Sequence, residues 1–292
     1  MRLAHISDLH ILDLHGVSPK RFLSRRVLGG AHLLVRRARE HLPELLENLA
    51  EDLLKEEPDH IVITGDLSNL ALESEFERVF QLIKLLGGYS KLSVVPGNHD
   101  YYTTQAADNR RFEKFFSPFM FRREFSDLDV DVYPYTKQVG ELYLVGVNSA
   151  TRTVPPLSYG TIGDRQLELI DKRLGAPERQ GHLTCLFLHH ALHTRDFVKE
   201  ATSGLLNRDR LLDLIQRHRV DLVLYGHDHV GRTWKQANRG HSTLFVCCGS
   251  STRLTDNPST MARYRLITVD HGRIRRVDTK VFDAQTRRFV VE

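Results

Sequence analysis

Residues 2–10 read RLAHISDLH, a short apolar run that ends in an aspartate and a histidine. Four further stretches repeat this arrangement of an apolar run followed at once by polar residues. The five runs cover residues 2–7, 60–64, 92–95, 183–188 and 222–225. Continuous apolar runs of this length fit strands that are buried on both faces, as in a mainly parallel sheet. The pattern therefore predicts an α/β fold in which the five runs are strands.

The polar cluster that ends each run contains side chains that can bind metals or act as acids and bases. The clusters are Asp8-Leu9-His10, Gly65-Asp66, Gly97-Asn98-His99-Asp100, His189-His190 and Gly226-His227-Asp228-His229. In open α/β sheets, ligands collect outside the carboxyl ends of the strands. Gly65-Asp66 and the cluster over residues 97–100 are each compatible with an ordinary turn, whereas the cluster over residues 226–229 is the strongest single indication of function. All five together, each after a strand, predict one shared site.

Helical patterns alternate with the strand-like runs and predict parallel pairing through crossover connections. The predicted helices run from Pro43 to before Pro58, over residues 72–86, over 164–174 and over 205–218. Residues 130–138 and 142–147 flank Gly140 and predict an antiparallel pair. Beyond Arg232, the runs 243–248, 263–269 and 273–281 predict a second, largely antiparallel sheet. The order of elements predicts a sandwich of two sheets with helices outside.

Composition places the 292-residue chain among ordinary globular proteins, with 41% hydrophobic and 27% charged residues. The proposed site draws on residues 8 to 229 without an intervening linker, so we expect one domain over residues 1–292. No apolar run reaches the length of a transmembrane helix, and we expect no signal peptide because the first predicted strand begins at residue 2. Three cysteines without a disulfide pattern favour reduced thiols and a cytoplasmic location.

The donor set of the clusters suits borderline first-row divalent ions such as Mn, Fe, Co, Ni or Zn, of which we favour Mn and Fe. Asp8 and His10 are two residues apart, and His227 and His229 repeat that spacing. A carboxylate such as Asp66, in the middle of the set, is placed to bridge two ions. Two ions about 3.5–4 Å apart can clamp a phosphoryl group and generate hydroxide near neutral pH. The clusters therefore predict a binuclear hydrolytic site.

These residues resemble the pattern of the calcineurin-like metallophosphoesterase superfamily: Asp-x-His, Gly-Asp, Gly-Asn-His-Asp/Glu, His and Gly-His-x-His. The resemblance implies an αββα sandwich of two mixed β-sheets flanked by helices, with two metals at the carboxyl ends of the strands. It implies that one metal is held by Asp8, His10 and His229, the other by Asn98, His189 and His227, and that Asp66 bridges them. It also implies a catalytic role for His99, oriented by Asp100, in contacting the phosphate or protonating the leaving oxygen.

Departures from individual branches of the superfamily narrow the expected activity. Residues 67–70 lack the arginine of phosphoprotein phosphatases, and Asn69 stands where purple acid phosphatases place a tyrosine ligand. His99 stands where UDP-diacylglucosamine hydrolases commonly have arginine. The chain is most similar to class III cyclic nucleotide phosphodiesterases and their glycerophosphodiesterase relatives, although Ala191-Leu192 replaces the prolines that often follow His-His there. This resemblance implies a phosphodiesterase that uses a metal-bridging hydroxide on a small phosphoester.

Two alternative activities remain open: hydrolysis of a lipid-linked or nucleotide-sugar diphosphate at a membrane surface, and a metal-dependent nuclease. A third alternative, a non-catalytic scaffold, is disfavoured because every ligand position is retained. Residues 19–41 form a basic insert that carries Arg21, Arg25, Arg36 and Arg39 on one predicted helical stripe. The insert has two interpretations. It is either a solvated helix or a segment that contacts an anionic membrane surface and makes the protein peripheral to the membrane. The sequence predicts neither an obligate protein partner nor an oligomeric state.

Overall fold

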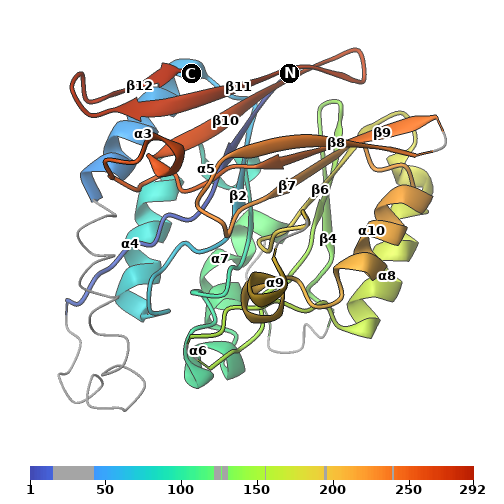
Figure 1. Ribbon diagram of the computed structural model, residues 1–292, viewed down its shortest axis with the longest axis horizontal. Helices are drawn as coiled ribbons and strands as arrows, with labels where there is room; N and C mark the ends of the chain where they lie inside the picture. The colour runs from blue at the N-terminus through green and yellow to red at the C-terminus, as the bar shows by residue number, and fades with distance from the viewer. Residues whose placement is uncertain (16–42, 122–125, 127–130, 155, 194–195, 239) are drawn as a thin grey trace.

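The computed structural model describes residues 1–15, 43–121, 126, 131–154, 156–193, 196–238 and 240–292. Two six-stranded sheets lie at its centre, and helices cover their outer sides (Figure 1). This arrangement confirms the predicted sandwich of two mixed sheets. The basic insert that the sequence places at residues 19–41 lies outside the described residues.

The first sheet joins the two ends of the chain. Its strand order is β12-β11-β10-β1-β2-β3. The parallel strands are β1 (Arg2–Ile6), β2 (His60–Thr64) and β3 (Leu92–Val95), and the antiparallel strands are β10 (Arg263–Asp270), β11 (Arg273–Asp283) and β12 (Arg288–Val291). Because β1 lies between β2 and β10, its carboxyl end is held in the middle of the sheet.

The second sheet has the order β4-β5-β6-β7-β9-β8. Its strands are β4 (Tyr135–Val139), β5 (Leu142–Gly146), β6 (Leu183–Phe187), β7 (Leu222–Tyr225), β9 (His241–Cys247) and β8 (Arg232–Asn238). Strands β5, β6, β7 and β9 are parallel, whereas β4 and β8 are antiparallel edge strands. The carboxyl ends of β6 and β7 therefore point the same way.

The prediction that the strands beyond Arg232 build a sheet of their own is wrong. Strands β8 and β9 extend the sheet of β6 and β7, whereas β10, β11 and β12 extend the sheet of β1. The hydrophobic periodicity and apolar content of a segment identify it as a strand and indicate its buried faces. They do not determine which other strand it pairs with. The pairing of Ala4 with Leu266 illustrates the choice, because it buries apolar residues from both ends of the chain.

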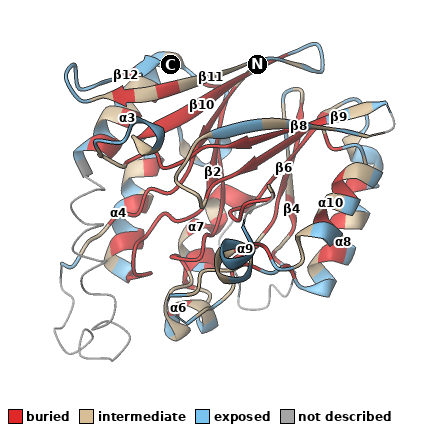
Figure 2. Ribbon diagram, in the orientation of Figure 1, coloured by how far each residue is buried: buried red, intermediate tan, exposed pale blue. Residues whose placement is uncertain are grey.

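Helices cover the outer faces of both sheets, and most of them bury residues on their inner side (Figure 2). They are α3 (Pro43–Glu56), α4 (Glu73–Lys84), α5 (Gly88–Lys91), α6 (Thr104–Asp108), α7 (Arg111–Phe121), α8 (Asp164–Leu174), α9 (Phe197–Ser203) and α10 (Arg208–Arg217). The leucine stripe of α3 contributes to a core cluster shared with β1, β2 and the inner face of the second sheet. Helices α8 and α10 bury theirs against the outer face of the second sheet. The predicted helix positions are confirmed to within a few residues.

One buried carboxyl group at the start of α4 makes stability depend on pH. Burial raises the pKa of Glu75 from about 4.5 to about 8, although the backbone N–H groups of Leu70 and Leu72 donate to its Oε2 at 2.8 and 3.1 Å. Between these pH values the folded chain keeps a proton that the unfolded chain has lost. The contribution of Glu75 to the free energy of unfolding therefore falls as pH rises through this window.

Glutamine mimics the protonated carboxyl group of Glu75. We therefore expect Glu75→Gln to remove a decrease in the free energy of unfolding, on the order of 3 kcal/mol, that the wild type shows between pH 5 and pH 8. Urea unfolding of both proteins at the two pH values measures the difference. Glu51→Gln, at an exposed position of α3, is the matched control and should leave the pH dependence unchanged. An equal pH dependence in wild type and Glu75→Gln would contradict the assignment.

Candidate metal centre

The five polar clusters meet at the carboxyl ends of β1, β2, β3, β6 and β7. Backbone hydrogen bonds tie neighbouring clusters together directly after the strands end. The N–H of Asp8 donates to the carbonyl of Gly65 at 3.0 Å, and the N–H of His10 donates to that of Asp66 at 2.9 Å. In the second sheet, the N–H of Gly226 donates to the carbonyl of His189 at 3.0 Å. The ligand loops thus continue the strand pairing beyond the sheets.

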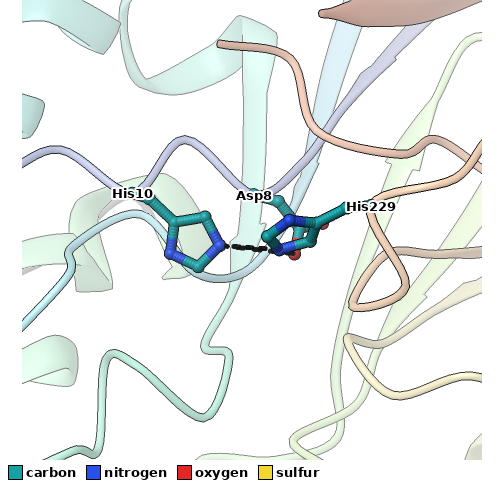
Figure 3. A group of neighbouring side chains, drawn as sticks. All are labelled: Asp8, His10 and His229. Carbon is teal, nitrogen blue, oxygen red and sulfur yellow. Dashed lines mark hydrogen bonds and ion pairs between the residues drawn. The ribbon is translucent and has the colours of Figure 1, made fainter. Parts of the chain in front are cut away.

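One group of candidate ligands consists of Asp8, His10 and His229. The Nε2 atoms of His10 and His229 lie 2.9 Å apart, with the rings directed toward one another beside Asp8 (Figure 3). The Oδ1 atom of Asp8 is 3.3 Å from His229 Nε2 and 3.8 Å from His10 Nε2. Residues separated by more than 200 positions in the sequence therefore direct three donor atoms at one point.

A second group surrounds His189. Its Nε2 atom lies 3.2 Å from Asn98 Oδ1, 3.2 Å from His227 Nδ1 and 3.4 Å from Asp66 Oδ2. The same Oδ2 atom of Asp66 is 3.6 Å from His10 Nε2 in the first group. Asp66 is thus placed between the two groups, as its predicted bridging role requires.

The donor chemistry of these groups fits divalent cations. The carbonyl of Thr64 lies 2.7 Å from His189 Nδ1, so Nδ1 carries a proton and Nε2 is the nitrogen that faces the other ligands. The buried Oδ1 of Asp8 accepts no hydrogen bond. Converging imidazole nitrogens beside a carboxylate oxygen without a donor are satisfied when a cation binds between them.

The electrostatics of the site favour a bound cation. Burial lowers the pKa of His189, but the charge of Asp66, a hydrogen bond that the carboxylate of Asp66 accepts from His189, and the charge of Asp8 together raise this pKa to about 9. Burial also opposes ionisation of Asp66, yet His189, His99 and His10 hold its pKa well below the usual value. The negative potential that retains a proton on His189 also attracts metal ions, which compete with that proton.

Backbone conformation marks the same positions. Five of the seven predicted ligands have positive φ angles: Asp8 (53°), His10 (46°), Asp66 (52°), His227 (75°) and His229 (57°). Non-glycine residues in the left-handed region are strained and concentrate at functional sites. The surrounding strands and loop hydrogen bonds hold these residues in conformations that they would otherwise avoid.

The prediction that Asp100 orients His99 is wrong. Both oxygens of Asp100 are used by other groups: Oδ2 accepts from the N–H of Leu67 and Gly97, and Oδ1 accepts from the N–H and hydroxyl of Ser68. The carboxylate therefore holds the loop after β2 against the loop after β3. Burial, followed by the charge of Asp66, raises the pKa of Asp100 to about 7.

His99 is oriented by backbone groups instead. Its Nδ1 atom lies 2.8 Å from the carbonyl oxygen of Asn69. The backbone N–H of His99 donates to Asp66 Oδ1 at 2.8 Å. Since a carbonyl oxygen only accepts hydrogen bonds, His99 Nδ1 carries a proton, and Nε2 lies on the side of the ring away from Asn69. His99 lines the cavity beside the metal ligands, where its predicted role in catalysis would place it.

Comparison with known proteins places the chain in a family. Residues 1–231 match the family described as calcineurin-like phosphoesterase. The chain belongs to this family. The predicted ligand His189 faces the other candidate ligands, whereas His190 contacts Ser149 Oγ and the carbonyl of Ser158.

Curated relatives of this calcineurin-like phosphoesterase are named as phosphodiesterases. The chain is 26% identical over 181 residues to a probable glycerophosphodiester phosphodiesterase of Arcobacter nitrofigilis, covering 60% of this chain and 58% of the relative. It is 26% identical to probable cyclic nucleotide phosphodiesterases of Rhodococcus erythropolis (60% and 53% covered) and Synechococcus (75% and 75% covered). The chain thus spans little more than half the length of the first two.

Solved structures share the fold of this calcineurin-like phosphoesterase at low sequence identity. A dimetal phosphatase from Danio rerio superimposes with a TM-score of 0.63 at 16% identity, covering 96% of this chain and 95% of that one. A purple acid phosphatase from yellow lupin gives a TM-score of 0.61 at 16% identity, covering 99% and 52%. Both support the αββα architecture.

Sequence reasoning missed part of the site. Ser158, Ser203 and Asp228 line the cavity together with the predicted residues. Asp228 lies between the predicted ligands His227 and His229, so its sequence position indicated that it would be close to the site. The serines lie in a loop and at the end of α9, and their local sequence gave no signal. Within the described ranges, no helix of this calcineurin-like phosphoesterase is long and apolar enough to cross a membrane.

Proposed function

We propose that this protein is a divalent-metal-dependent phosphoester hydrolase whose substrates are phosphodiesters. The observation that carries the proposal is the convergence of the five strand-end clusters. Asp8, His10 and Asp66 belong to three overlapping groups of three residues, and within each group the carboxylate and imidazole donor atoms lie within 4.8 Å of one another. Family membership and the names of the curated relatives support the same activity.

The ligand assignment follows the two groups of the site. Asp8, His10 and His229 would hold one ion, Asn98, His189 and His227 would hold the other, and Asp66 would contact both. When bound, two such ions neutralise charge on the phosphoryl oxygens and lower the pKa of coordinated water. We propose Mn or Fe, because imidazole, carboxylate and amide donors suit these ions.

The residues beyond the ligands position and exchange protons. The carbonyl of Asn69 accepts from His99 Nδ1 and orients the ring, whose Nε2 would face a bound substrate. In its protonated form this nitrogen would donate to the leaving oxygen of the ester. The Asp100 carboxylate holds the loop that carries His99 against the loop that carries Asp66, so that both face the same cavity.

The charge of the cavity wall favours diesters over monoesters. Among the described residues that line the cavity there is no lysine or arginine. A phosphate monoester is a dianion near neutral pH, and sites that recognise it commonly add an arginine or lysine. A phosphodiester carries one negative charge, which the two proposed ions can neutralise.

We expect the kcat/KM of the Mn-loaded protein for bis-p-nitrophenyl phosphate to be at least about tenfold higher than that for p-nitrophenyl phosphate. Removal of metal with EDTA should abolish both activities, and added Mn should restore them. Elemental analysis of the restored protein should give two ions per chain. Activity that survives complete metal removal would contradict the proposal.

A further inference from the structure

The carboxylate of Asp8 uses its two oxygens differently. Oδ2 lies 2.6 Å from the hydroxyl of Ser7 and accepts from the backbone N–H of His227 at 3.1 Å. Oδ1 accepts no hydrogen bond from any described residue and lies 3.3 Å from His229 Nε2. Two donors on one oxygen hold the plane of the carboxylate and leave the other oxygen to a metal ion. The residues that supply these donors therefore control a candidate ligand.

Ser7 is itself held by a chain of side chains that reaches into the core. The Oγ1 atom of Thr64 lies 2.8 Å from Ser7 Oγ, and Nε2 of His5 lies 2.9 Å from Thr64 Oγ1. His5 and Thr64 lie on the neighbouring parallel strands β1 and β2. The side chains of the chain and of Asp8 are completely buried. The chain thus runs from the interior of the first sheet to the metal centre and is closed to solvent.

The hydrogen atoms of this chain point toward Asp8. A carboxylate oxygen accepts, so the single hydrogen of the Ser7 hydroxyl goes to Asp8 Oδ2; the uncharged carbonyl of Thr64 is farther away, at 3.2 Å. Ser7 therefore accepts from Thr64 Oγ1, and because the hydrogen of Thr64 is then used, His5 Nε2 donates to Thr64. Burial, followed by the charge of Arg265, lowers the pKa of His5 to about 3, so its ring is neutral and carries one proton, on Nε2.

His5 makes this donation at a cost to stability. No described residue forms a hydrogen bond with its buried Nδ1 atom. An unpaired buried acceptor destabilises the fold, and a leucine at position 5 would avoid this cost. Core packing therefore gives no reason for a histidine at this position, whereas donation to Thr64 does.

Thr64 also connects the chain to the second group of candidate ligands. Its hydroxyl donates to Ser7, while its carbonyl lies 2.7 Å from Nδ1 of His189. The loop after β7 packs directly on the chain, because a Cβ at Gly226 would overlap Ser7 Oγ and Asp8 Oδ2. One residue at the end of β2 is thus in contact with the support of a ligand in each group.

We propose that His5, Thr64 and Ser7 are positioning residues that orient Asp8 to bind a divalent cation. The proposal rests on the proposed function, because it concerns the same metal centre, and it adds residues that lie behind the ligands. Each donor directs the hydrogen of the next one, so loss of either hydroxyl or of the ring N–H leaves the carboxylate of Asp8 less restrained. Removal of groups that orient metal ligands typically lowers metal affinity about 10–100-fold.

Titration of EDTA-treated protein with Mn, followed by calorimetry, tests the chain without any substrate. We expect Thr64→Val, which removes the hydroxyl but keeps the backbone carbonyl, to lower the Mn affinity at least about tenfold. Ser7→Ala removes the last donor of the chain and should lower the affinity to a similar extent. Thr64→Ser retains the hydroxyl and should bind Mn within about threefold of wild type.

His5 has a matched control on the neighbouring strand. His60 is equally buried, and its Nε2 lies 2.9 Å from the hydroxyl of Ser93, but this pair lies near the amino ends of β2 and β3, away from the ligands. His5→Leu and His60→Leu each remove a buried ring and its hydrogen bond to a hydroxyl, and urea unfolding measures the stability of both. We expect the Mn affinity to fall about tenfold in His5→Leu and to stay at the wild-type value in His60→Leu.

The outcomes distinguish this inference from the proposed function. Wild-type Mn affinity in Thr64→Val and Ser7→Ala would overturn the inference and leave the proposed function intact. Losses of affinity in His5→Leu and His60→Leu that simply follow their losses of stability would show that His5 acts only through the fold. A wild type that binds Mn without hydrolysing bis-p-nitrophenyl phosphate would contradict the proposed function alone, and a wild type that binds no Mn would contradict both.

Discussion

Asp66→Asn is expected to reduce the hydrolysis of bis-p-nitrophenyl phosphate by at least about a thousandfold. The Oδ2 atom of Asp66 faces His10 Nε2 at 3.6 Å and His189 Nε2 at 3.4 Å, so it serves both candidate metal positions. An amide binds divalent ions more weakly than a carboxylate because it carries no charge. The measurements are kcat/KM with Mn and metal content by elemental analysis, which should fall below two ions per chain.

The fold should survive this substitution. The asparagine side chain retains an oxygen that can accept from the N–H of His99, as Oδ1 of Asp66 does at 2.8 Å. Circular dichroism should therefore show native secondary structure and a cooperative thermal transition. Asp209→Asn on the exposed side of α10 removes the same charge away from the site and should keep full activity. Wild-type activity in Asp66→Asn would refute the ligand assignment.

Gly65→Ala is expected to lower the free energy of unfolding by about 3 kcal/mol or more and to weaken metal binding. Gly65 has a φ of +86°, and a Cβ there would lie 2.5 Å from Gly97 N and 2.8 Å from Pro96 C. These are backbone atoms of the loop after β3 and cannot rotate away. The carbonyl of Gly65 also accepts from the N–H of Asp8, so displacement of this residue moves a ligand.

Gly272→Ala separates the two causes. Gly272 also has a positive φ, +66°, but nothing lies within 4 Å of its would-be Cβ. We expect only the conformational cost of about 1 kcal/mol at this position. Thermal unfolding of both variants and metal titration by calorimetry measure the contrast. If Gly65→Ala is no less stable than Gly272→Ala and binds two Mn ions, the close approach of the two loops is unimportant.

Local elements of the fold were predictable because they depend on neighbouring residues. The strand over residues 60–64 and the helix over 164–174 have the boundaries that the sequence predicts. The antiparallel pair around Gly140 was predicted too, although its first strand begins only at Tyr135. The assignment of the C-terminal strands failed, because a strand pattern does not state which of two sheets the strand will join.

In the candidate site, too, some features were predictable from the sequence and others were not. Cluster composition and the rule that ligands gather at strand ends predicted that residues 8 to 229 would meet, and the geometry brings all seven predicted ligands together. Their roles as ligands remain predictions that the Asp66 variant tests. The hydrogen bonds of Asp100 and the approach of Ser158 and Ser203 join segments far apart in sequence. No local pattern encodes those contacts.

The sequence by itself determined the kinds of donor atom, their spacing within each loop and the strands that present them, because short-range patterning controls these features. Only the tertiary structure decided that β1, between β2 and β10, brings Asp8 and His10 to His229, and that Thr64 contacts both Ser7 and His189. Those outcomes depend on packing between two sheets, which sums many contacts across the whole chain. RLAHISDLH therefore predicts a strand with metal ligands at its end, and the sandwich supplies their partners.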